Sequence, residues 1–346
     1  MTQTYLADHV SVAPRYQRSV RIDADFGQAD PLSGYVLQGS ARDALTTTLR
    51  LATNGQGAFT WTGPYGGGKS SLALALASYS LGRGPAFKEA KQLLCDVPEV
   101  TAVFGRAPKD WLCVPLSGRR GDPVADLREA LASAIAGEPG HARTKRSKME
   151  AADGRDIVER LQREVEARPK GGVLVIVDEL GKYLEGAADH AIDIHFFQDL
   201  AEAANRSEGR LIVVGVLHQA FERYADRLGQ SVQDEWRKIQ GRFADVPIIT
   251  AVDEVIELVG RAVTTERSHP QSHAIAAVVA SEIAERRPGV PKDLAERLGD
   301  CWPLNPAAAA LLGPITRRRF SQNERSLFGF LASAEPNGFT EFLQRT

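Results

Sequence analysis

The sequence predicts an α/β fold in which a parallel sheet of about five strands lies between two helical layers and is followed by an all-helical region. Short apolar runs rich in β-branched residues recur along the chain, and amphipathic stretches separate them. Strands that are apolar on both faces and alternate with helices are typical of a parallel sheet covered on both sides. After Thr250 the strand signal stops and only helical patterns follow. The runs that we assign to strands lie at about 58–62, 111–116, 173–177, 211–217 and 246–250.

Amphipathic periodicity predicts the helices between and after these strands. The stretches 122–135 and 156–165 fall within the sheet region. Pro270, Gly289–Pro291 and Pro303 divide the last part of the chain, because proline disfavours the continuation of a helix. The helices predicted there lie at 253–265, 273–286, 292–300 and 307–312. The predicted parts of the chain are an N-terminal segment with one helix (1–55), an α/β core (56–250) and a helical domain (251–346).

The composition excludes several classes of protein. The 346 residues carry 42 Lys and Arg against 44 Asp and Glu, so no overall basic charge points to nucleic acid or to an anionic membrane. Cys95, Cys113 and Cys301 are far apart and fit neither a disulfide framework nor a metal site. The N-terminus lacks the pattern of a signal peptide, and the longest apolar runs are too short to span a bilayer. These features predict a cytoplasmic protein.

The most specific motif is a glycine-rich octapeptide between the first predicted strand and a helical stretch. It fits the pattern G-x-x-x-x-G-K-[ST] without a mismatch and reads Gly63-Pro64-Tyr65-Gly66-Gly67-Gly68-Lys69-Ser70. In such a P-loop, backbone N–H groups surround a phosphate chain, the lysine reaches the β- and γ-phosphates and the serine hydroxyl binds Mg²⁺. The helix beginning near Ser71 points its N-terminus at the same anion. A glycine-rich surface turn is the alternative, but the strand–loop–helix setting favours nucleoside triphosphate binding.

A second element of the same site is the apolar run 173–177, which ends in Asp178 and Glu179. A carboxylate at the end of a buried strand lies at the carboxyl edge of the sheet, beside the P-loop, where it can help Ser70 to hold Mg²⁺. Glu179 is then placed to orient the water that attacks the γ-phosphate. Acidic residues also cap helices, so the pair is informative mainly because the chain has a P-loop.

Two further strand ends carry polar residues. The strand at 211–217 is followed by His218 and Gln219, and either side chain can hold the attacking water or sense the γ-phosphate; a helix cap is the alternative for His218. Arg242 precedes the last strand, where an arginine offered by a neighbouring subunit can neutralise charge that develops on the γ-phosphate. A salt bridge at a helix end is the alternative for Arg242.

The order of these motifs resembles that of the AAA+ and STAND ATPases. Gly241-Arg242-Phe243 with Asp245 is similar to their Gly-Arg-Phe-Asp motif, which implies that Arg242 completes the site of a second copy in a homo-oligomer. Tyr35 and Val36, ahead of Arg42, resemble the adenine-facing segment of origin-recognition-like ATPases. The resemblance implies ATP and Mg²⁺ as ligands and a helical lid that supplies a second sensor arginine, for which Arg319 and Arg325 are the candidates. His-Gln at the sensor strand departs from the family's usual Asn or Ser.

A narrower resemblance concerns bacterial phage defence. Asp178–Glu185 and Asn323–Phe328 resemble segments of large ATP-binding proteins in BREX-type clusters, which implies a role in anti-phage defence. The basic segment 137–149 is either a nucleic-acid contact or a solvated loop. The alternatives to an ATPase that drives conformational change are a slowly hydrolysing assembly or signalling switch and an ATP-dependent nucleic-acid-binding protein. Leu116-Ser117-Gly118 resembles the start of an ABC signature, but Arg119 and Arg120 follow it, which disfavours an ABC ATPase.

Overall fold

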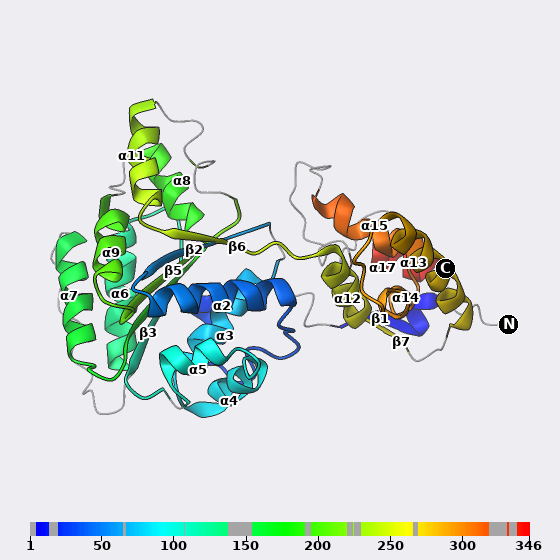
Figure 1. The fold of residues 1–346 in the computed structure, drawn as a ribbon, viewed down its shortest axis with the longest axis horizontal. Coiled ribbons are helices and arrows are strands. Elements are labelled where there is room, and N and C mark those ends of the chain that lie inside the picture. Colours follow the sequence, from blue (N-terminus) through cyan, green and yellow to red (C-terminus); the bar gives the residue numbers. More distant parts are fainter. Residues whose placement is uncertain are drawn as a thin grey trace. The chain divides into compact units, whose positions relative to one another are not determined.

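The computed structural model describes residues 5–13, 20–64, 67–106, 108–137, 154–190, 195–219, 224, 230–265, 269–317, 331 and 338–346 of the chain. The chain forms two units (Figure 1). The larger unit comprises Val20–Pro64 and Gly68–Ile248 and holds the main sheet. The smaller unit contains Met1–Ser19 and Ile249–Thr346 and is mainly helical.

A five-stranded parallel sheet forms the centre of the larger unit, in the order β3-β4-β5-β2-β6. Helices connect strands that follow one another in the chain, as parallel pairing requires. β2 lies between β5 and β6, so the loop after β2 emerges from within the sheet and not from its edge. The strands are β2 (Ala58–Thr62), β3 (Trp111–Ser117), β4 (Gly172–Asp178), β5 (Leu211–Leu217) and β6 (Ala244–Pro247).

Helices cover both faces of this sheet, as Figure 1 shows. Alternate side chains of β4 enter two separate hydrophobic clusters: Val175 enters one and Ile176 enters the other. The cluster of Val175 includes residues of α6 (Pro123–Ala136), α7 (Gly154–Glu166), α8 (Gly181–His190), α9 (His195–Asn205) and α11 (Gln230–Gln240). The cluster of Ile176 includes residues of α1 (Ile22–Asp25), α2 (Gly39–Thr53), α3 (Lys69–Ser80), α4 (Gly84–Leu93) and α5 (Pro98–Phe104). The predicted three-layer α/β arrangement is therefore confirmed.

The strand that leads into the glycine-rich loop is anchored on two sides. Trp61 is wholly buried, and its Nε1–H donates to Thr48 Oγ1 on α2 at 2.9 Å. On the side of β6, Asp245 accepts hydrogen bonds from the hydroxyls of Thr60 and Thr62, at 2.8 and 3.2 Å. A buried indole N–H and buried hydroxyls are costly without partners, so these bonds fix β2 between α2 and β6.

The smaller unit combines helices with a two-stranded antiparallel ribbon. Its hydrophobic cluster includes Ile256, Val259 and Leu298, all nearly or wholly buried. Pro270 is the first residue of its longest described helix, a position at which the missing N–H costs no hydrogen bond. The elements are η1 (Leu6–Asp8), β1 (Val10–Val12), α12 (Val252–Ala262), β7 (Val263–Thr265), α13 (Pro270–Arg286), α14 (Leu294–Gly299), α15 (Pro306–Arg317) and α17 (Phe339–Arg345).

Several predicted boundaries are wrong; the helix predicted at 307–312, for example, continues to Arg317. The helix predicted over 253–265 ends at Ala262, and the β-branched residues that follow form β7, which pairs with β1. A strand therefore does occur after Thr250. Its partner, β1, lies near the N-terminus, and local periodicity cannot reveal a pairing between segments so far apart in the sequence. The strand predicted at 246–250 is β6 at Ala244–Pro247, because its partner β2 ends at Thr62 and Ile248 N makes the last bond to that strand, at 2.7 Å.

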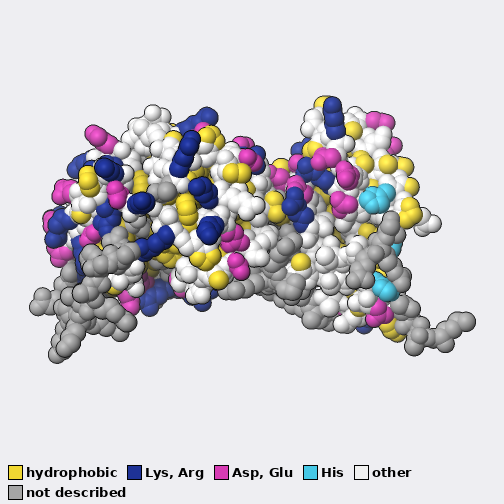
Figure 2. Space-filling view, turned by 90° about the horizontal axis from the view of Figure 1, so that it is seen from below, with side chains coloured by type: hydrophobic (Ala, Val, Ile, Leu, Met, Phe, Trp, Pro, Cys, Tyr) yellow, Lys and Arg dark blue, Asp and Glu magenta, His cyan; other side chains and the backbone are white. Residues whose placement is uncertain are grey.

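Basic and acidic side chains both occur on the face that Figure 2 shows, in line with the formal net charge of −2. Among the described helices, none has the length and apolar character needed to cross a bilayer.

Candidate functional site

The glycine-rich loop joins β2 to α3, as its motif requires. β2 ends at Thr62 and α3 begins at Lys69, with Gly68 as its N-cap in a left-handed conformation (φ 73°) that favours glycine. Gly63 has no room for a side chain, because a Cβ atom there would lie 2.2 Å from the carbonyl oxygen of Ile248. Tyr65 and Gly66, the central residues of the loop, lie outside the described residues.

Lys69 is buried at the start of α3. Its side chain crosses back over the loop, and Nζ donates to the carbonyl oxygens of Gly63 and Pro64, both at 2.7 Å. Burial lowers the pKa of the Lys69 ammonium to about 8, and the nearby Asp178 carboxylate opposes this shift. The ammonium therefore remains mostly charged at neutral pH, beside the helix N-terminus that also favours anions.

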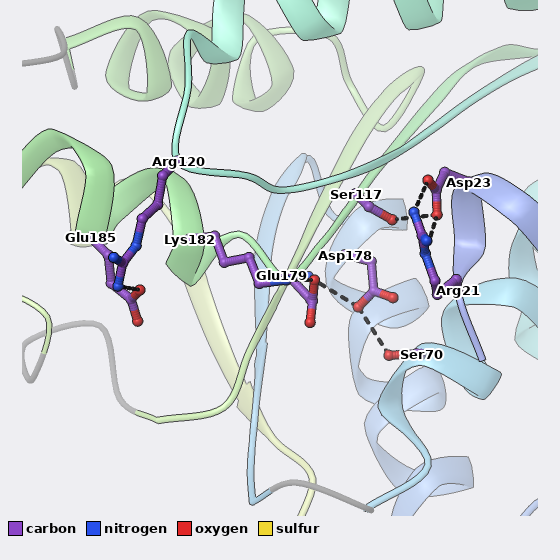
Figure 3. A network of polar contacts seen from close by, with 9 residues as sticks. All are labelled: Arg21, Asp23, Ser70, Ser117, Arg120, Asp178, Glu179, Lys182 and Glu185. Carbon is purple, nitrogen blue, oxygen red and sulfur yellow. Dashed lines mark hydrogen bonds and ion pairs between the residues drawn. The ribbon is translucent and has the colours of Figure 1, made fainter. Parts of the chain in front are cut away.

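Asp178 and Ser70 face each other across the site (Figure 3). Asp178 is the last residue of β4 and is 2% exposed, and Ser70 lies in the first turn of α3. The Ser70 hydroxyl donates to Asp178 Oδ1 at 3.0 Å. Burial raises the pKa of the Asp178 carboxyl to about 6, although the Ser70 hydrogen bond favours its charged form. A hydroxyl and a carboxylate are the oxygen ligands that Mg²⁺ takes in proteins, so the pair fits this cation.

Glu179, the next residue, has an unusual backbone conformation. Its φ of 54° lies in the left-handed region that glutamate rarely adopts, and its N–H donates to Asp178 Oδ1 at 3.0 Å. The half-buried side chain forms an ion pair through Oε2 with Lys182 Nζ, on the first turn of α8. Positive φ at a polar residue beside a buried carboxylate is the kind of local strain that functional sites retain.

His218 follows β5 and lies near both lysines of the site. Burial, together with the positive charges of Lys69 and Lys182, lowers the pKa of its imidazole to about 3. His218 is thus neutral at physiological pH, in which state it can donate one hydrogen bond and accept another. Gln219, the other candidate at this strand end, is half-buried.

Tyr35 and Val36 are half-buried in the segment before α2. The Tyr35 ring lies against the loop, since a Cβ atom built on Gly68 would be 3.5 Å from a ring carbon. An aromatic ring therefore borders the glycine-rich loop on the side of the N-terminal segment.

Arg242 lies at the opposite end of β2 from the loop. Its carbonyl oxygen accepts from Asn205 Nδ2 at 2.9 Å and from Gln56 Nε2 at 3.3 Å, and Gln56 precedes β2. Its guanidinium pairs with Glu202 at 3.2 Å and is half-exposed. The five residues of β2 span roughly 16 Å, so the Arg242 side chain cannot reach the site of its own chain.

Some of the predicted residues cannot be placed. Arg319 and Arg325, the two candidates for the second sensor, lie outside the described part of the chain, and so does most of the basic segment 137–149.

Three residues in or around this site were not predicted from the sequence: Lys182, Ser117 and Arg21, whose partner Asp23 accepts a hydrogen bond from Ser117. Lys182 pairs with Glu179, and Ser117, the last residue of β3, lies opposite Asp178 in the β3–β4 register. Ser117 could have been found as a polar residue that ends a buried strand. Arg21 lies before any predicted element, and no signal in the sequence marks it.

The comparisons with known proteins leave the family open. No protein-family model matches the chain, and no curated protein matches it in sequence. Among solved structures, the ORC2 protein of Aeropyrum pernix, solved in ADPNP and ADP complexes, is similar over 78% of this chain and 71% of its own, with 14% identity and a TM-score of 0.43. PCH-2 of C. elegans is similar over 92% and 70%, with 12% identity and a TM-score of 0.28.

Both similarities are too weak to bear on function. The arrangement of the chain itself defines the class: a P-loop between β2 and α3, an Asp-Glu pair after β4, a polar residue after β5, a Gly-Arg-Phe turn before β6 and then a helical unit. In fold, the protein is a three-layer α/β unit with a five-stranded parallel sheet and a P-loop motif after β2, followed by a mainly helical unit.

Proposed function

We propose that the protein binds ATP with Mg²⁺ and hydrolyses it. One observation carries the proposal: the Ser70 hydroxyl and the Asp178 carboxylate are 3.0 Å apart, although they come from different elements, and the buried Lys69 ammonium lies beside them. A P-loop motif could occur by chance, but chance would not place a buried strand-end carboxylate on its serine. We place the activity in the cytoplasm.

The residues divide the work as follows. The N-terminus of α3 and Lys69 bind the phosphate chain, and Ser70 and Asp178 hold Mg²⁺. When bound, Mg²⁺ neutralises charge on the β- and γ-phosphate oxygens. Glu179 orients the attacking water and accepts its proton, and the neutral His218 holds that water or the γ-phosphate oxygen through its ring N–H. Tyr35 and Val36 border the adenine, and one of Arg319 and Arg325 supplies the second sensor.

Hydrolysis is completed between copies of the chain. Arg242 is out of reach of its own site, and within the described part of the chain its half-exposed guanidinium forms one ion pair, with Glu202. A surface pair of this kind is worth about 0–1 kcal/mol, so it can be exchanged for a phosphate contact. We therefore assign Arg242 to the active site of a neighbouring copy, within a homo-oligomer.

A second candidate is a nucleotide-dependent switch with slow hydrolysis, and the Glu179–Lys182 ion pair favours it. While the Glu179 carboxylate is held by the Lys182 ammonium, it is not free to orient water, so turnover is slow until the pair opens. The resemblance to phage-defence proteins, and through it an anti-phage role, suits either candidate. A nucleic-acid or protein partner would stimulate turnover by opening the pair.

The test compares the wild-type protein with Asp178→Asn and Ser70→Ala. Calorimetry with ATP should show binding that weakens when EDTA removes Mg²⁺, and both variants should lose this dependence on Mg²⁺. Phosphate release then separates the two candidates. Continuous turnover, with or without stimulation by polynucleotide, supports an ATPase that hydrolyses ATP repeatedly. A single turnover with retained ADP supports a switch. Absence of ATP binding by the wild-type protein would overturn both.

A further inference from the structure

A one-turn helix ahead of the P-loop, α1, is fixed to the edge of the candidate site. Ile22 is wholly buried, and Asp25, which is 6% exposed, accepts a hydrogen bond from Arg21 N at 2.9 Å. At the end of β3, the Ser117 hydroxyl donates to Asp23 Oδ1 at 2.9 Å. Ser117 is the register partner of Asp178, so α1 is held one strand away from the carboxylates of the site.

The Arg21 guanidinium is held at this edge by Asp23, the residue that Ser117 contacts. Its Nε and one terminal nitrogen donate to the two oxygens of Asp23, at 3.3 and 2.7 Å, and the side chain is 67% exposed. The hydrogen bond to Asp23 and the charge of Asp23 raise the pKa of Arg21, and the Glu179 carboxylate adds a smaller effect in the same direction. In Figure 3, Asp178 lies between Arg21 and Asp23 on one side and Glu179 on the other.

We propose that Arg21 contacts the terminal phosphate of the nucleotide in its own subunit and stabilises the charge that develops there during hydrolysis; this inference rests on the proposed function. Among the described residues, the site contains two carboxylates, and Lys182 is paired with one of them, so Lys69 is the main positive charge that they leave for phosphate. A guanidinium binds phosphate through two parallel N–H bonds. The exposed ion pair between Arg21 and Asp23 is weak enough to be exchanged for a contact with phosphate. Until then, Asp23 holds the Arg21 side chain near the place of the terminal phosphate.

The neighbouring arginines provide a contrast. Arg119 donates to Asp126, which also accepts from the Tyr183 hydroxyl at 2.7 Å, and Arg120 pairs with Glu185 of α8 at 3.0 Å. Both hold the loop after β3 to helices. Neither Arg119 nor Arg120 is paired with a residue next to Asp178. Arg120 is therefore a suitable control, because its replacement removes one positive charge near the site without removing the contact that we propose for Arg21.

The test uses Arg21→Ala, Arg21→Lys and the control Arg120→Ala in the full chain, with kcat, KM and the affinities for ATP and ADP measured at saturating Mg²⁺. Arg21→Ala should lower kcat by roughly 10²-fold or more, as the loss of a preorganised transition-state contact does. It should lower affinity for ATP by about tenfold and leave that for ADP unchanged, because only ATP carries the γ-phosphate. Arg21→Lys should recover part of kcat, and Arg120→Ala should match the wild type.

Two results would overturn the inference. One is an Arg21→Ala variant whose kcat and ATP-to-ADP preference equal those of a wild-type protein that hydrolyses ATP; the proposed function would then stand. The other is equal loss of ATP and ADP affinity with a lowered melting temperature, which would make Arg21 structural. A wild-type protein that binds no ATP would overturn the inference together with the proposed function.

Discussion

The Ser70 hydroxyl donates to Asp178 Oδ1 at 3.0 Å although the two residues are 108 positions apart in the chain. The contact exists because β2 and β4 are parallel neighbours of the central β5, so that the loop after β2 and the end of β4 emerge at the same edge of the sheet. Every functional residue that follows a strand end is brought to this edge by the same rule. Under the proposed function, the contact also fixes where the phosphate and the metal ion bind.

Lys69→Ala should abolish nucleotide binding or weaken it at least tenfold. The variant removes a buried ammonium that reaches two loop carbonyls, and a charge-assisted contact to phosphate is worth more than one tenfold step in affinity. Calorimetric titration with MgATP measures the effect. Lys88→Ala, an exposed lysine on α4, is the matched control and should bind as the wild type does. Equal affinity in both variants would remove Lys69 from the site.

Glu179→Gln should keep ATP bound while hydrolysis falls by orders of magnitude. The amide cannot accept the proton of the attacking water, but Ser70, Asp178 and Lys69 are unchanged. ATP affinity by calorimetry and phosphate release are measured on the same preparation. Unchanged phosphate release would exclude Glu179 from the mechanism.

The sequence predicts the parts of this fold that local patterns encode. The strand and the helix on either side of the P-loop motif and four of the five predicted strands match the structure closely, because glycine spacing and buried apolar runs are local signals. The position of Asp178 beside Ser70 was also predictable, since parallel strands end at one edge. β7 was not, because its partner β1 lies far away in the sequence. The positions of Arg21 and Lys182 were not predictable either. That of Arg21 depends on how α1 packs against β3, and that of Lys182 depends on the turn after Glu179.

Lys182→Met should raise turnover. The ion pair with Lys182 holds the Glu179 carboxylate, and its loss frees this carboxylate to act on water. The turnover rate should rise by up to about fivefold, which corresponds to the free energy of a partly exposed ion pair. The steady-state rate of phosphate release at saturating MgATP is the measurement. Lys170→Met removes an exposed lysine before β4 and should have no effect. A lower rate in Lys182→Met would mean that Lys182 contributes to the site directly.

His218 should make the free energy of unfolding depend on pH in the acidic range. Its folded pKa of about 3 lies below the ordinary 6.5, so below pH 6.5 the unfolded chain gains a proton that the folded chain does not. The free energy of unfolding therefore falls as pH decreases from 6.5 towards 3. At roughly pH 5 the upper limit of this loss is about 2 kcal/mol. The actual loss is smaller, because His218 is partly exposed to solvent. Urea unfolding of the wild type and of His218→Asn, which cannot titrate, should show this difference at low pH. At pH 8 the linkage contribution vanishes. Parallel pH profiles for the two proteins would contradict the shift.

Arg242→Ala should abolish most hydrolysis while leaving the affinity for ATP nearly intact. The side chain lies beyond the far end of β2 from its own P-loop, so under the proposed function it would contact the phosphate of a second copy, and that contact would strengthen only in the transition state. An arginine that acts in this way is typically worth roughly 10³ in turnover. Arg206→Ala, which removes an exposed arginine paired with the same Glu202, is the matched control and should be active.

Mixing Arg242→Ala with Glu179→Gln protein tests whether the contact is made between copies. Each variant alone has only defective sites. In mixed assemblies, some interfaces join an intact Glu179 with an intact Arg242 from the other variant, so activity should partly return. Co-assembly is verified by pull-down of one tagged variant with the other. If the two proteins co-assemble and the mixture stays as inactive as its components, Arg242 acts within its own subunit or only stabilises the fold. Undiminished turnover at dilutions at which the wild-type protein is monomeric would lead to the same conclusion.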